Sequence, residues 1–121
     1  MLKKAGFDNS PSFKNAVKYI IKKQNADGSW GVKNRNRPSK NLRTSLALNS
    51  LIISNSPHNK KRIEKGINWL LNTQKSDGSW DGGMFVGWPG KKEDIFTTTT
   101  VIRMLNKYRA CLREENIENV F

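Results

Sequence analysis

Few side chains in this sequence suit acid–base, nucleophilic or metal chemistry, and they stand far apart. The one histidine, His58, is remote in the chain from any cluster of carboxylates or thiols, and the one cysteine, Cys111, has no histidine near it. A zinc site needs three or four ligands, so no metal site is predicted. Glu93 and Asp94 precede an expected helix, where acids stabilise the helix dipole, and we interpret them so rather than as catalytic acids. We therefore assign no catalytic residue and no cofactor.

Two other segments carry side chains that suit binding. Phe85, Trp88 and Phe96 form an aromatic group that is a candidate ligand or partner surface, although packing within the turn "GWPG" is the simpler role for Trp88. The segment "KNRNRPSKNLR" has five positive charges and no acid. Its candidate anion-binding residues are Lys33, Arg35, Arg37, Lys40 and Arg43.

The net charge of +12 is unevenly placed along the 121 residues. Residues 1–65 hold 15 basic and three acidic residues, whereas residues 66–121 hold seven of each. Such asymmetry is typical of proteins that bind nucleic acid, anionic lipid or an acidic protein. No aromatic residues interleave with the basic segment 33–43, so sequence-specific base recognition is not expected.

A repeated phrase is the strongest pattern. "QNADGSWG" begins at Gln24 and "QKSDGSWD" begins at Gln74, fifty residues later. A period of 20–50 residues is typical of a copied supersecondary unit. The shared positions are Gln24, Gly28 and Trp30 in the first copy and Gln74, Gly78 and Trp80 in the second.

The elements around each phrase repeat as well. An amphipathic helix precedes each one, with Ser10 and Pro11 expected to open the first and Ser56 and Pro57 the second. A second, more apolar helix follows each phrase, over residues 41–54 and 96–108, which align at an offset of 54. Four consecutive threonines favour a strand by propensity, but this alignment favours a helix.

The sequence thus predicts an all-α fold of two stacked helical hairpins within a single domain, residues 1–121. Repeat 1 spans about residues 11–54 and repeat 2 about residues 56–109, and the tail 110–121 adds a helical turn or is loose. Neither a signal peptide nor a stretch long and apolar enough to span a bilayer is recognised. With one cysteine and so no internal disulfide, we expect a cytoplasmic protein.

The helix followed by Gln-x(3)-Gly-x-Trp resembles the QW repeat of the terpenoid cyclase and protein prenyltransferase superfamily, whose fold is an α/α toroid. The resemblance covers about residues 12–108. It implies that Gln24 and Gln74 hydrogen-bond to loop or helix backbone. It also implies that the Gly-x-Trp turns pack their indoles so as to join neighbouring helices.

The residues depart from this family where its chemistry resides. Residues 82–97 are similar to a segment of prenyltransferase β-subunits that supplies a zinc-ligating histidine, but Thr97 stands at that position. The Asp-x-Asp-Asp acid of class II cyclases has no match either. A full toroid has about six hairpins, and two cannot close a ring, so the repeat ends need to be covered.

Three functional hypotheses follow. The first is a non-catalytic interaction or scaffold module that docks another chain, or itself, to complete a toroid. The second is a fragment or subunit of an enzyme that lines an isoprenoid cavity with Phe85, Trp88 and Phe96. The third is a nucleic-acid or anionic-surface binder acting through residues 33–43.

Overall fold

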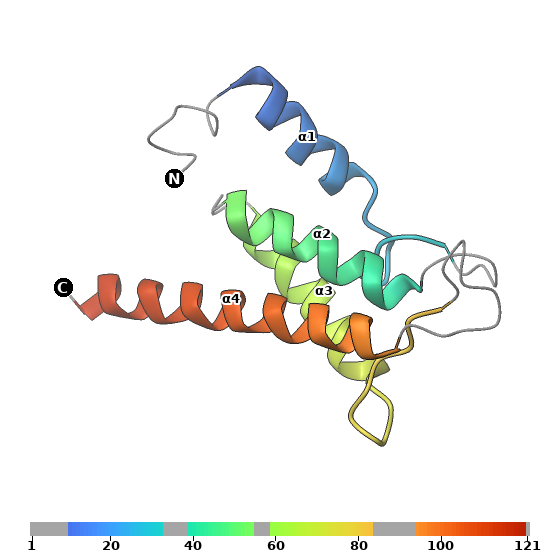
Figure 1. Ribbon diagram of the computed structural model, residues 1–121. Coiled ribbons are helices and arrows are strands. Elements are labelled where there is room, and N and C mark those ends of the chain that lie inside the picture. Colours follow the sequence, from blue (N-terminus) through green and yellow to red (C-terminus); the bar gives the residue numbers. More distant parts are fainter. Residues whose placement is uncertain (1–9, 33–38, 55–58, 84–93, 121) are drawn as a thin grey trace.

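The computed structural model describes residues 10–32, 39–54, 59–83 and 94–120. In these ranges it has four helices: α1 (Pro11–Lys22), α2 (Lys40–Ser54), α3 (Lys60–Thr73) and α4 (Asp94–Val120), with no extended strand. α2 lies between α1 and α4, and α3 crosses behind it (Figure 1). The predicted all-α fold of two helical hairpins is confirmed.

The two outer helices begin differently. At α1, the Ser10 hydroxyl accepts the N–H of Phe13 at 3.1 Å, and Pro11 opens the helix as expected. The start predicted at Ser56 and Pro57 falls outside the described residues. α3 begins at Lys60, after Asn59, whose side chain makes no capping hydrogen bond. The two outer helices therefore share their apolar spacing but not their N-terminal caps.

The inner helices α2 and α4 pack against each other more extensively than any other pair, and α3 and the two tryptophans complete the core. Leu48 and Leu51 of α2, together with Val101 and Met104 of α4, are almost fully buried. The predicted strand preference of Thr97–Thr100 is overridden, because burying Val101 and Met104 requires helical spacing. The helix also continues to Val120, so the tail from residue 110 is part of α4 rather than a separate segment.

α3 approaches α2 closely at Gly66. A Cβ atom on Gly66 would lie 2.7 Å from Leu48 Cδ2 and 3.2 Å from the Gly28 carbonyl oxygen. Glycine inside a helix usually costs about 1 kcal/mol relative to alanine. Here it lets the outer helix of repeat 2 pack directly on the inner helix and the turn of repeat 1.

Candidate functional site

The repeated phrases form two turns, which we call turn 1 (Gln24–Gly31) and turn 2 (Gln74–Asp81). In turn 1 the indole N–H of Trp30 donates to the Ile20 carbonyl at 2.7 Å, and its backbone N–H donates to Thr44 Oγ1 at 2.9 Å. Trp30 therefore ties the last turn of α1 to α2. The Ile20 carbonyl also accepts the N–H of Lys23 at 3.2 Å, so the indole is a second donor to a carbonyl at the helix end.

Turn 2 repeats these bonds residue for residue. The indole N–H of Trp80 donates to the Leu70 carbonyl at 2.8 Å, and its backbone N–H donates to Thr98 Oγ1 at 2.9 Å. Both indoles are buried. Thr44 and Thr98 align at the offset of 54, so the sequence showed that the two threonines correspond. It did not show that each accepts a hydrogen bond from the tryptophan of its turn.

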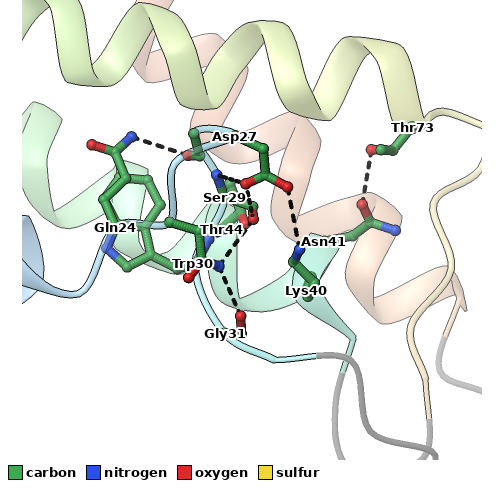
Figure 2. A network of polar contacts seen from close by, with 11 residues as sticks. Gln24, Asp27, Ser29, Trp30, Gly31, Lys40, Asn41, Thr44 and Thr73 are labelled. Carbon is green, nitrogen blue, oxygen red and sulfur yellow. Dashed lines mark hydrogen bonds and ion pairs between the residues drawn. The ribbon is translucent and has the colours of Figure 1, made fainter.

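An aspartate shapes each turn. Asp27 accepts the backbone N–H and the hydroxyl of Ser29, as Asp77 does for Ser79 (Figure 2 shows the first pair). The hydroxyl and then the N–H of Ser29 lower the pKa of Asp27 to about 2, and Lys40, at 3.4 Å, acts in the same direction. Ser79 likewise lowers the pKa of Asp77 below its ordinary value. Both aspartates are therefore anions that hold their turns at neutral pH.

The ion pairs beside the turns have opposite polarity. In repeat 1 the acid belongs to turn 1 and the base, Lys40, to α2. In repeat 2 the base, Lys75, belongs to turn 2 and the acid, Asp94, to α4, at 2.8 Å. The hydrogen bond that Lys75 donates to Asp94 raises the pKa of Lys75. The Trp turn thus keeps its geometry whether the turn supplies the acid or the base of the neighbouring ion pair.

The two turns differ most in what covers them. The side-chain amide of Gln24 donates both to Gly28 O within turn 1 and to Arg62 O of α3, each at 3.0 Å. A Cβ atom on Gly28 would lie 2.6 Å from the Lys65 carbonyl oxygen. The backbone of α3 therefore lies directly on turn 1.

Turn 2 has no such cover among the described residues. Gln74 donates to Gly78 O within the turn, at 2.8 Å, and both residues are exposed. A Cβ atom on Gly78 would meet nothing within 4 Å, although its φ of +92° is close to the +98° of Gly28. The backbone conformation that admits a neighbouring helix is present, but no helix of the described chain lies there.

The inner helices show the same contrast. Leu42 and Leu48 of α2 are 5% and 0% exposed, whereas their counterparts on α4, Phe96 and Ile102, are 52% and 51% exposed. Ile95 is 84% exposed. The positions that α2 buries under its neighbours are thus uncovered on α4. We call turn 2 together with Ile95, Phe96 and Ile102 the open end.

The predicted binding residues are only partly placed. Lys33, Arg35, Arg37, Phe85 and Trp88 lie outside the described residues. Lys40 is paired with Asp27 and lies over the Trp69 ring at 5.3 Å, and the Arg43 side chain passes over Gly31. The anion-binding and ligand roles stay predictions.

Sequence reasoning missed one link between the repeats. Asn41, which is buried in α2, donates to the Asp81 carbonyl at 3.3 Å. It also accepts the Thr73 hydroxyl at 2.9 Å, a bond that Figure 2 shows. Ser39 N–H also donates to Gly82 O at 3.1 Å. The counterpart of Asn41 is Ile95, so the repeat alignment gave no signal for a shared function here.

Groups for chemistry remain sparse in the described ranges. There, no group of three or more His, Cys, Asp and Glu residues could hold a metal ion. Thr97, at the position that the resemblance gives to a zinc-ligating histidine, is fully buried, and its hydroxyl makes no hydrogen bond to the described residues. None of the described helices is long and apolar enough to cross a bilayer.

The model of the squalene-hopene cyclase C-terminal domain family matches residues 2–111. The chain belongs to this family. It is 36% identical to a squalene–hopene cyclase of Zymomonas mobilis over 81 residues, which is 66% of this chain and 12% of that enzyme. It is 30% identical to protostadienol synthase A of Arthroderma gypseum over 108 residues, 81% of this chain and 14% of that enzyme.

A lanosterol synthase of Saccharomyces cerevisiae is 29% identical over 83 residues, 61% of this chain and 11% of the enzyme. No solved structure gives a significant match. The predicted membership of the terpenoid cyclase superfamily is confirmed. The aligned part of the chain spans only 11–14% of the length of these relatives, so it corresponds to a small part of a squalene-hopene cyclase C-terminal type toroid.

Proposed function

We propose that this chain is a non-catalytic scaffold segment of an α/α toroid, which acts by docking an outer helix on its open end. The observation that carries the proposal is the difference between the two turns. Gly28 is covered by the α3 backbone, whereas Gly78 has the same φ and no neighbour. Because the molecule already makes this contact once, the chemistry of the occupant is defined: an amphipathic helix with a small residue at the contact.

The open end has the features of a docking surface. It combines the exposed apolar side chains Phe96 and Ile102 with the amide of Gln74, whose counterpart donates across to a helix carbonyl. Apolar side chains give affinity when they are buried, and a directed hydrogen bond fixes the register. The described residues include no cluster of acids or metal ligands that would suggest a reaction there.

A helical peptide tests the proposal directly. The probe is a synthetic peptide of residues 59–74, with a hydrocarbon staple joining positions 64 and 68, which are exposed in α3. The staple removes most of the cost of helix nucleation. On binding to the isotope-labelled full chain, we expect amide chemical-shift changes in turn 2 and the first half of α4, but not in turn 1, which α3 already covers.

The matched control is the same stapled peptide carrying Gly66→Leu. The added side chain would collide with Ile102 and the Gly78 carbonyl as it would with their counterparts in repeat 1, so this peptide should not bind. Absence of shifts with the first peptide, or equal shifts with both, would contradict the proposal.

A second candidate, the wall of an isoprenoid cavity, is favoured by the exposed ring of Phe96 and by the cyclase and synthase names of the relatives. A titration of the full chain with an isoprenyl diphosphate, followed by tryptophan fluorescence, separates the two candidates. A saturable change that Phe96→Ala abolishes supports the cavity. No change, together with binding of the peptide, supports the scaffold.

A further inference from the structure

α1 is the sequence counterpart of the helix that covers turn 1. At the offset of fifty, the α3 residues that touch turn 1, namely Arg62, Lys65 and Gly66, correspond to Ser12, Asn15 and Ala16. These three α1 residues are exposed, and none of the residues of α1 is fully buried. α1 thus has the helix surface that turn 2 lacks.

The geometry points to a second copy of this chain as the occupant of the open end: α1 of one copy covers turn 2 and α4 of the next, as α3 covers turn 1 and α2 within each copy. This inference rests on the proposed docking function and names its partner. Gln74 would donate to the Ser12 carbonyl of the second copy, in place of the bond from Gln24 to Arg62 O.

The small residue needed at the contact is present. Gly66 meets Leu48 Cδ2 and Gly28 O, and a Cβ atom there would require the leucine to shift. The corresponding contact would place Ala16 against Ile102. Because Ile102 is 51% exposed and therefore free to change rotamer, it can yield to one methyl group where the buried Leu48 cannot.

The charge distribution favours this arrangement over a symmetric one. α1 has four lysines in or next to it and no acid, so two α1 helices brought together would repel each other. The half of the chain that forms the open end, residues 66–121, has no net charge. Contact of α1 with the open end therefore avoids most of the repulsion. Such a contact is heterologous, so copies join head to tail and either close a ring or extend.

Two variants test the inference by blocking one side each. Ala16→Lys blocks the α1 side, and Ile102→Lys blocks the open end; both positions are exposed, so the isolated fold should be preserved, as circular dichroism can check. In analytical ultracentrifugation we expect the average mass of the wild-type protein to rise above the monomer mass as its concentration increases. Each variant alone should associate roughly 100-fold more weakly, since a lysine would be buried without a partner.

Mixing the two variants gives the decisive result. The Ile102→Lys chain keeps its α1 surface and the Ala16→Lys chain keeps its open end, so the mixture should form a complex of two chains and nothing larger. The control Leu46→Lys removes another half-exposed apolar side chain and should associate as wild type does.

The other outcomes overturn the inference in distinguishable ways. If Ala16→Lys associates normally while Ile102→Lys does not, two open ends meet each other. If wild type stays monomeric up to millimolar concentration but the stapled peptide still binds, the occupant is another chain and the docking function stands. If the mass does not rise and the peptide does not bind, both proposals fail.

Discussion

Turn 1 and turn 2 have the same Trp and Asp hydrogen bonds and nearly the same glycine φ, but in the part of the chain that the structure describes only turn 1 has a helix packed on it. The contacts of the repeat thus fall into two groups, which we call layers: those within one hairpin and those between one hairpin and the next. The bonds of Trp30 and Trp80 belong to each hairpin alone, because they are equally complete whether or not a neighbour is present. The second bond of Gln24 and the crowding at Gly28 belong to the stacking of one hairpin on the next.

The largest expected difference between the turns is at the glycines. Gly28→Ala places a Cβ atom 2.6 Å from the backbone of Lys65 at a φ of +98°, so we expect a loss of about 3–5 kcal/mol from strain and collision together. Gly78→Ala has the strain without the collision and should cost about 1–2 kcal/mol. Urea unfolding of the two variants measures both values, and equal losses would show that α3 does not lie on turn 1.

The tryptophans should show no such difference. Trp30→Phe and Trp80→Phe each remove an indole N–H from a helix-end carbonyl, which should cost about 1–3 kcal/mol in either repeat. Thermal unfolding followed by far-ultraviolet circular dichroism suits both variants. A much smaller loss at Trp80 would mean that its hairpin depends on a missing neighbour, and the separation into two layers would be wrong.

The glutamines test the stacking layer by itself. Gln24→Ala removes bonds to Gly28 O and Arg62 O, whereas Gln74→Ala removes only the bond to Gly78 O. We expect the first variant to lose about 1 kcal/mol more than the second. The acceptor of the second bond is the backbone carbonyl of Arg62, which a side-chain mutation cannot remove, so a double-mutant cycle is not suitable here. The difference between the two glutamine variants is the better measurement.

The smallest effect is expected from acid. The pKa of Asp27 is about 2 in the folded protein and near 3.8 when unfolded, so its ionised form stabilises the fold above pH 4. That contribution should be lost as the pH falls from 4 to 2. Since the carboxylate is 49% exposed, we expect less than about 1 kcal/mol.

Unfolding free energies of wild type and Asp27→Asn at pH 6 and pH 2.5 measure this term. The variant should be the less stable protein at pH 6 and should approach wild type at pH 2.5. If the gap is the same at both pH values, ionisation of Asp27 does not support turn 1. Asp77→Asn, with a pKa lowered in the same direction, provides the comparison in turn 2.

The sequence predicted what is local and periodic. The i, i+3, i+4 spacing in α1 and the alignment of Thr44 with Thr98 were sufficient for the four helices and their pairing into hairpins. The end of α4 was not predictable in this way. The start predicted at Pro57 by analogy with Pro11 stays a prediction, since it lies outside the described residues. No Gly or Pro follows Tyr108 to end α4, and that helix continues to Val120.

The site was predictable only within each turn. That Gln24 would bond to backbone followed from the resemblance, but its second acceptor, Arg62 O, depends on how α3 crosses the first hairpin. Likewise the counterparts Leu48 and Ile102 are both apolar, and nothing in their types reveals that one is buried and the other exposed. Contacts between repeats depend on which helices lie beside each repeat, and the sequence pattern of a single repeat does not reveal this.

The length of α4 has a consequence for any assembly. α2 ends at Ser54, which aligns with Tyr108, so residues 109–120 of α4 have no counterpart in α2 and extend the helix by about 18 Å (Figure 1). A covering helix as short as α1 would not reach the C-terminal part of α4. Cleavage after the exposed Arg113 should therefore leave such a contact intact.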